Sequence, residues 1–141
     1  MKAFPLIVLL LGCAALIGCM HTVIGGNPTR SPDGRYYLGM EKHGASGKAY
    51  TARTKKRVYV WLGPTSRNNS APSLDKKYVF VAGDLASHIQ WKGSDEVTIE
   101  FYDFGDGVLA SEARQRGIPS NHVGSLRFTR DAHTGRFVEE K

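Results

Sequence analysis

Cysteine is scarce in this chain of 141 residues, which contains Cys13, Cys19 and no other. A domain built from the residues after Cys19 therefore has no disulfide, no thiolate nucleophile and no cysteine-bound zinc. Its stability has to come from a hydrophobic core, and a domain of about 120 residues buries roughly two thirds of its unfolded surface. The length fits one domain and excludes a nucleotide-binding domain joined to a substrate domain.

Several motifs that carry enzyme chemistry are also absent. No Gly-x-Ser-x-Gly, no Gly-x-Gly-x-x-Gly and no Walker loop occurs. The histidines form no His-Glu-x-x-His or His-x-His pair and are scattered, at His21, His43, His88, His122 and His133. We therefore expect no catalytic residues, no metal, no cofactor and no enzyme activity. No nucleic-acid recognition motif is present either.

Positive charge exceeds negative charge, with 19 Lys and Arg against 13 Asp and Glu, for a formal net charge of +6. The densest basic run is Arg53-Thr54-Lys55-Lys56-Arg57. Arg53, Lys55, Lys56 and Arg57 are candidate ligands for phosphate groups of lipid headgroups or other polyanions. The alternative is a solvated turn whose cations protect a sheet edge from aggregation.

The first twenty residues differ in character from the rest. Lys2 is followed by eighteen residues, 3–20, without a charge. A charged start, an apolar stretch and small residues near its end are typical of a secretory signal peptide. An uncleaved membrane-spanning helix is the alternative, because about 17–25 apolar residues cross a bilayer. Either segment predicts a domain outside the cytoplasm.

Leu16-Ile17-Gly18-Cys19 resembles the lipobox of bacterial lipoproteins. The resemblance implies cleavage between Gly18 and Cys19, a diacylglycerol thioether on Cys19 and a further acyl group such as palmitate on the new amine. A second Gly-Cys pair ends at Cys13, but cleavage there would leave a signal shorter than the usual range of about 15–30 residues.

The lipobox resemblance also implies a location. In enteric bacteria an aspartate after the lipidated cysteine retains the protein at the inner membrane, and this chain has Met20 there. For a source with two membranes we expect the periplasmic face of the outer membrane. The chain is divided into a signal peptide (1–18), a lipidated tether (19–34) and a β-rich domain (35–141), with a turn at Ser31-Pro32-Asp33-Gly34.

Short segments rich in β-branched and aromatic residues predict a mainly β domain. The expected strands are Arg35–Lys42, Lys56–Leu62, Lys77–Ala82, Ser87–Trp91, Glu96–Asp103, Ser125–Arg130 and Gly135–Glu139. The second and third are apolar on both faces and are expected to be central. A loop at 63–75, a short helix at 107–116 and a hairpin loop at 131–135 complete the prediction. We expect an antiparallel β-sandwich or a partly open barrel.

A second resemblance supports the β prediction. The Ser-Pro-Asp-Gly-Arg-Tyr segment at 31–36, the Val-Tyr-Val-Trp strand at 58–61 and the Trp-x-x-x-Asp-x-Val-x-Ile pattern at 91–99 are similar to small bacterial lipoprotein domains of unknown function. The resemblance implies no known activity.

One acidic loop is a candidate for cation binding. Asp103 and Asp106 are separated by Phe104-Gly105, and carboxylate oxygens bind hard cations. The alternative, which we favour, is a polar turn in which Asp106 caps the following helix.

Together these patterns predict a membrane-anchored lipoprotein of the cell envelope with a non-catalytic binding or structural role. Its partners would be the membrane, envelope polyanions or another envelope protein. The alternative is a partner-inhibiting lipoprotein of the immunity or inhibitor type, and a small envelope enzyme is the third possibility.

Overall fold

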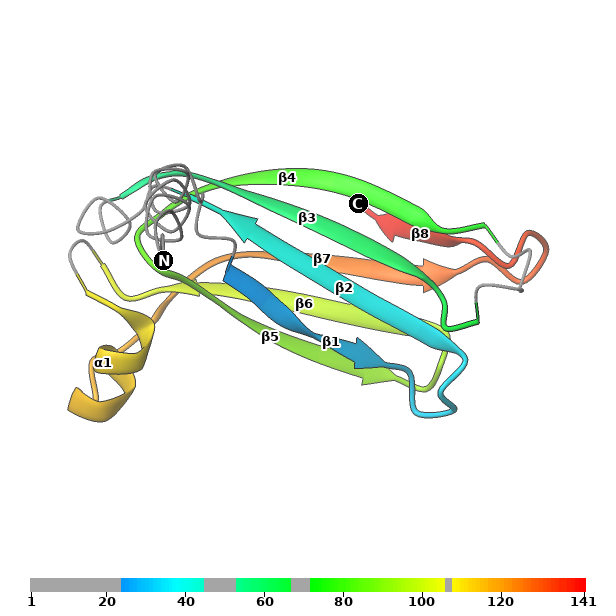
Figure 1. Ribbon diagram of the computed structural model, residues 1–141, viewed down its shortest axis with the longest axis horizontal. Coiled ribbons are helices and arrows are strands. Elements are labelled where there is room, and N and C mark those ends of the chain that lie inside the picture. Colours follow the sequence, from blue (N-terminus) through cyan, green and yellow to red (C-terminus); the bar gives the residue numbers. More distant parts are fainter. Residues whose placement is uncertain (1–23, 45–52, 67–71, 106–107) are drawn as a thin grey trace, which may run out of the picture.

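The computed structural model describes residues 24–44, 53–66, 72–105 and 108–141. Eight antiparallel strands form two four-stranded sheets (Figure 1). The first, which we call sheet A, has the order β1 (Ile24–Arg30), β2 (Tyr36–His43), β3 (Thr54–Pro64) and β4 (Leu74–Ala82). The second, sheet B, has the order β5 (Leu85–Lys92), β6 (Glu96–Asp103), β7 (Asn121–Arg130) and β8 (Phe137–Glu140).

The two sheets pack face to face around an apolar core. Side chains alternate along each strand, so that Leu38 and Leu62 are paired in register and both fully buried. Across the sheets, Phe80 of β4 lies 4.6 Å from Phe101 of β6, measured between ring centroids. This confirms the predicted β-sandwich, and in the described residues no strand of one sheet pairs with a strand of the other.

The predicted strands and the single helix are confirmed, with shifts of a few residues at their ends. The helix α1 (Ala110–Arg116) projects from one end of the sandwich between β6 and β7 (Figure 1). Gly117 ends it in the left-handed conformation, with φ of 67°, and its amide bonds back to the last turn. The turn at residues 31–34 is also confirmed, because the Gly34 amide donates to the Ser31 carbonyl at 2.8 Å.

Residues 24–30 differ from the sequence-based expectation. The expected tether (19–34) includes them, with breaker residues at Gly25, Gly26 and Pro28, but they form β1, the edge strand of sheet A. Its pairing with β2 shifts register between Gly26 and Thr29. A proline without an amide hydrogen is tolerated at an irregularity of an edge strand, so these residues interrupt the ladder without ending it.

The strand β4 is the second correction. Its apolar composition predicted a central strand, yet it is the other edge of sheet A. Val79 and Val81 point away from the core and are each 52% exposed. Only β3 of the two strands expected to be central is interior.

Residues 1–23 lie outside the described part of the chain. Within that part, no helix has the length and apolar character needed to cross a membrane.

Candidate functional site

The basic run at the start of β3 is divided between the two faces of sheet A. Lys55 and Arg57 point outward and are exposed, and Arg53 precedes the strand and is exposed as well. Lys56 points inward and is only 2% exposed. The structure therefore separates Lys56 from Lys55 and Arg57, because neighbouring residues of a strand face opposite sides.

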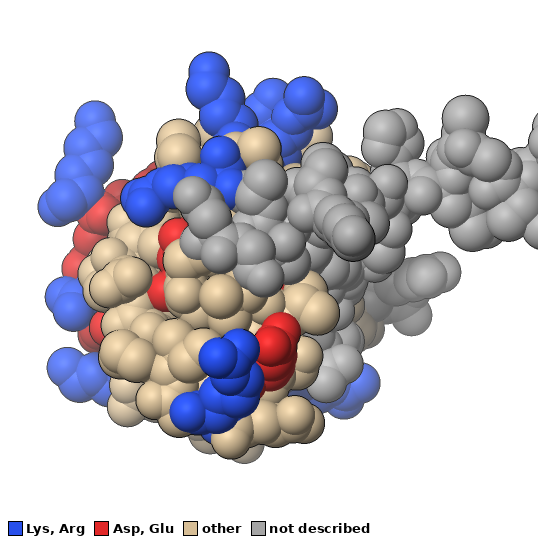
Figure 2. Space-filling model, turned by 90° about the vertical axis from the view of Figure 1, so that its left-hand side faces the viewer, with Lys and Arg blue, Asp and Glu red and all other residues tan. Residues whose placement is uncertain are grey.

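The register adds one cation that the sequence run did not include. Lys77 of β4 lies opposite Tyr59 of β3, on the same outer face as Lys55 and Arg57. Figure 2 shows Lys and Arg side chains gathered along the upper edge of one end of the molecule, where β3 begins and β4 ends in Figure 1. We call Arg53, Lys55, Arg57 and Lys77 the cationic group.

Aromatic side chains continue along this outer face, from His43, opposite Arg57, to Trp61 at the far end. Tyr37 of β2 and Trp61 of β3 are half-buried, and their ring centroids are 5.2 Å apart. His43 lies edge-on to Tyr59, at 4.9 Å. We call these four residues the aromatic group. Aromatic residues at strand spacing are usually core residues, so the sequence pattern did not single out this group.

Two glycines allow the Tyr37 and Trp61 rings to lie close to the sheet. A Cβ atom added to Gly39 would be 3.1 Å from the Tyr37 ring, and one added to Gly63 would be 3.1 Å from the Trp61 ring. In the register, Tyr37 faces Gly63 and Gly39 faces Trp61. Each ring therefore has a glycine beside it on its own strand and another directly across.

Ionisable groups also enter the interior, near the end of the sandwich that carries α1. The Lys42 ammonium donates a hydrogen bond to the Leu85 carbonyl, at 2.8 Å, and so connects the two sheets. Burial lowers the pKa of Lys42, and the nearby Asp84 carboxylate opposes that effect. Burial likewise lowers the pKa of Lys56, opposed by Asp84 and Asp103.

These interior groups have structural roles in the described contacts. Asp84 accepts the Ala110 amide at 2.7 Å, which fixes the first turn of α1. Asp103, 2% exposed, accepts the Gly105 amide at 2.9 Å. The sandwich therefore buries two lysines beside two carboxylates, an arrangement that links the sheets to α1.

The acidic loop after β6 is only partly described. Asp103 is buried, and Asp106 lies outside the described residues. The expected cap by Asp106 therefore falls outside the described residues, and within them Leu109 is the N-cap position and Asp84 accepts an amide of the first turn. Among described residues, no group of three His, Cys, Asp or Glu is arranged to hold a metal ion.

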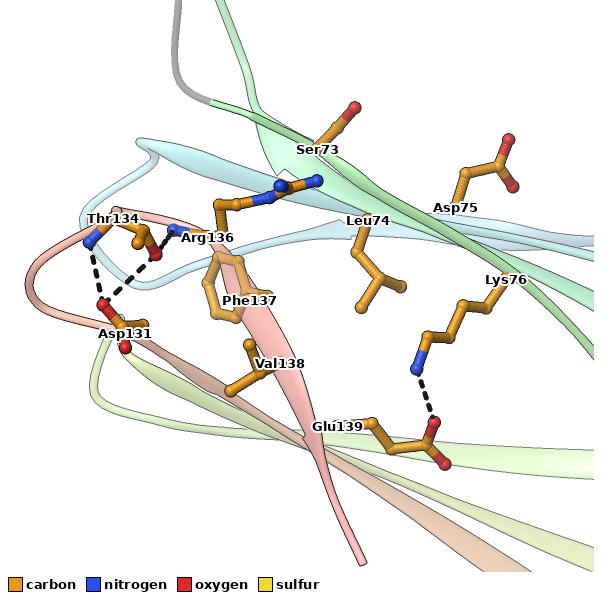
Figure 3. Close-up of a pocket in the computed structure, with 10 residues that line it drawn as sticks. All are labelled: Ser73, Leu74, Asp75, Lys76, Asp131, Thr134, Arg136, Phe137, Val138 and Glu139. Carbon is orange, nitrogen blue, oxygen red and sulfur yellow. Dashed lines mark hydrogen bonds and ion pairs between the residues drawn. The ribbon is translucent and has the colours of Figure 1, made fainter.

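An open groove of about 670 Å³ lies between β4 and the β7–β8 hairpin (Figure 3). Leu74 and the nearly buried Phe137 contribute apolar surface. Glu139 closes one side, because its Oε2 accepts hydrogen bonds from the Lys76 ammonium at 2.9 Å and from the Tyr78 hydroxyl at 3.0 Å. Burial and the Glu139 carboxylate raise the pKa of Tyr78.

Two residues of the groove have a spacing found in some serine hydrolases. Ser73 and Lys76 form a Ser-x-x-Lys sequence. They point apart in Figure 3, and the Lys76 ammonium is paired with Glu139. The described geometry therefore does not bring the Lys76 ammonium to the Ser73 hydroxyl.

The remaining predicted site residues are elsewhere. Gly18 and Cys19, the expected cleavage and lipidation site, lie outside the described residues. His88, one of the scattered histidines, is exposed on β5. Comparisons with protein-family models, with curated proteins and with solved structures found no match to this chain.

Proposed function

We propose that this chain is a membrane-anchored lipoprotein of the bacterial cell envelope that binds phosphate-bearing polyanions without catalysing a reaction. The lipobox-like sequence ending at Cys19 supports the anchor. Two or more acyl chains hold a protein firmly at a membrane, at about 0.8 kcal/mol for each buried CH₂ group. The domain would then work within reach of the membrane surface.

The observation that carries the binding proposal is the exposure of Arg53, Lys55 and Arg57 on one face of sheet A. No ion pair between these side chains and a carboxylate occurs among the described contacts. Cations gathered on one face attract anionic groups, and each Lys or Arg near an anionic surface contributes about 1 kcal/mol.

The anchor is tested by the intact mass of the protein purified from bacterial membranes. We expect an N-terminal residue at Cys19 that carries lipid mass. Cys19→Ala should abolish the lipid, whereas the matched control Cys13→Ala should keep it. A native protein that begins at Met1, or that carries no lipid, would refute the anchor.

Polyanion binding is tested with the full chain in phosphatidylcholine nanodiscs and inorganic polyphosphate as the probe. We expect Lys55→Ala/Arg57→Ala to weaken binding about tenfold or more, and salt to weaken binding to the unsubstituted protein. Lys92→Ala/Arg136→Ala is the matched control, because it removes the same charge from exposed residues outside sheet A. Equal losses in the two variants would mean that net charge, not this face, governs binding.

The groove and the free edge of β4 favour a second candidate, a lipoprotein that inhibits a protein partner. Among the described residues β4 pairs only with β3, and such an edge offers hydrogen bonds to a partner backbone, with Val79 and Val81 as exposed apolar surface beside it. A stoichiometric envelope protein that co-purifies with the chain, is lost with Val79→Lys/Val81→Lys and is kept with Lys55→Ala/Arg57→Ala would favour this candidate.

A further inference from the structure

The outer face of sheet A changes chemical character along β3. Its outward positions run from Arg53 through Lys55, Arg57 and Tyr59 to Trp61. At about 3.3 Å per residue, Trp61 lies roughly 13 Å from Arg57 and 26 Å from Arg53. Along β3 the face is cationic at Arg53 and aromatic at Trp61, and the two groups meet in between, where Lys77 lies opposite Tyr59 and His43 lies opposite Arg57.

The aromatic end suits an uncharged ring. Tyr37 and Trp61 contact each other over the paired glycines and remain partly open to solvent. The face of an aromatic ring is electrically negative, whereas the flat face of a sugar ring presents weakly positive C–H groups. Stacking of a sugar on these rings therefore combines electrostatic attraction with burial of apolar area.

Carboxylates beside the aromatic group also favour a sugar as the ligand. Asp75 lies opposite Trp61 and is exposed, and Glu41 lies opposite Tyr59 with a side chain that is 62% exposed. A carboxylate accepts hydrogen bonds from hydroxyl groups, which sugars carry in abundance, and it repels phosphate. The face around Trp61 is thus suited to hydroxyl groups, and the nearest cation of the cationic group is Lys77, opposite Tyr59.

We propose that the outer face of sheet A binds a phosphorylated glycan chain. A sugar unit stacks on Tyr37 and Trp61 with its hydroxyl groups directed to Asp75 and Glu41. A phosphate group further along the chain binds Arg57 and Lys55. This inference rests on the proposed polyanion binding and names the ligand class for the same face.

The division of the face distinguishes this ligand from a lipid membrane. A flat anionic membrane surface would bring phosphates against the carboxylates as well as against the cationic group. A chain in which sugars and phosphates alternate can place a sugar against the aromatic rings and carboxylates and a phosphate against the cationic side chains. The glycan therefore matches both ends of the face, and the lipid headgroups match one.

The experiment measures binding of three probes to the full chain in phosphatidylcholine nanodiscs. The probes are dextran phosphate, unmodified dextran and inorganic polyphosphate, compared at equal concentrations of sugar or phosphate. We expect dextran phosphate to bind most tightly. Trp61→Ala should weaken dextran phosphate binding about three- to tenfold and leave polyphosphate binding unchanged.

Two further variants separate ring stacking from damage to the sheet. Trp61→Phe keeps an aromatic ring over Gly63 and should restore most of the dextran phosphate affinity. Asp75→Asn should weaken dextran phosphate binding and strengthen polyphosphate binding, because it removes a carboxylate near Lys77. A loss of both affinities that follows a fall in thermal stability would assign Trp61 a purely structural role and overturn the stacking proposal.

The outcomes also separate this inference from the proposed function. Binding of polyphosphate with no gain from dextran phosphate would retain the polyanion function and overturn the glycan. Absence of binding to polyphosphate and to dextran phosphate would overturn both. If phosphatidylglycerol vesicles compete with polyphosphate more strongly than dextran phosphate does at equal phosphate, the ligand is lipid and the glycan assignment is wrong.

Discussion

At the scale of single residues, Lys56 is a basic side chain that the sandwich buries, at 2% exposed. Strand alternation alone places Lys56 on the opposite face from Lys55 and Arg57. Lysine is nevertheless rarely buried, and composition gives no reason to place it inside. Its neighbouring carboxylates, Asp84 and Asp103, come from the other half of the chain, so only the folded structure brings them together.

Gly63 is a residue whose importance the sequence did not indicate. A Cβ atom there would lie 2.9 Å from the Ser73 Cβ and 3.1 Å from the Trp61 ring. We expect Gly63→Ala to lower the free energy of unfolding by about 1–3 kcal/mol through overpacking. Urea unfolding measures the loss.

A double variant tests the cause of that loss. Adding Ser73→Gly to Gly63→Ala removes the shortest contact and should recover part of the stability, relative to Ser73→Gly alone. Purely additive losses would mean that the contact with Ser73 is not the cause.

The lowered pKa of Asp33 predicts that the protein loses stability at acidic pH. The hydrogen bond from the Ser31 hydroxyl, together with those from Arg35, lowers the pKa of the Asp33 carboxyl below its ordinary value of 3.8. A lowered pKa in the folded state stabilises the fold above pH 3.8, and this contribution is lost as the pH falls through the folded-state pKa.

Asp33→Asn should therefore lower stability at pH 6 and make the decline below pH 4 shallower. Urea unfolding between pH 2 and pH 7 is the measurement. Ser31→Ala should weaken the same dependence, because the Ser31 hydroxyl is the largest cause of the lowered pKa. An unchanged acid decline in Asp33→Asn would contradict the assignment.

At the scale of elements, β-branched and aromatic runs predicted the strands, whereas position within a sheet was not predictable. The apolar residues of β4 are typical of a central strand, yet the outer face of this edge strand carries Val79 and Val81. Whether a strand is interior depends on which strands pair beside it, and that pairing is not local. The groove beside β4 was unpredictable for the same reason, because it combines β4 with β8.

In the short strand β8, Phe137 is the one buried side chain. Phe137 is 4% exposed and lies edge-on to Tyr36, at 5.1 Å, and to Trp91, at 6.1 Å. We expect Phe137→Ala to cost about 3–5 kcal/mol. The neighbouring Val138→Ala, at a side chain that is 50% exposed, should cost less than about 1 kcal/mol. Similar losses for the two, measured by urea unfolding, would refute this role of the ring.

At the scale of the whole molecule, the free edge of β4 predicts self-association at high concentration. An exposed edge with apolar side chains can pair with another copy. Val81→Lys should reduce association, measured by light scattering at increasing protein concentration. Val138→Lys on β8 is the control for added charge. Equal reductions by both substitutions would show that charge alone, not the β4 edge, controls association.

The order of pairing in the two sheets has a consequence for assembly. Every pair of neighbouring strands is consecutive in the chain, and the described structure passes from sheet A to sheet B at Gly83 and Asp84. Short sequence separations favour rapid folding. A polypeptide nicked between these two residues would yield one complete meander on each side of the break. Such fragments, mixed in solution, should associate through the apolar inner faces of their sheets and restore the native structure. The hydrogen bond from Lys42 to the Leu85 carbonyl would then form between the two fragments.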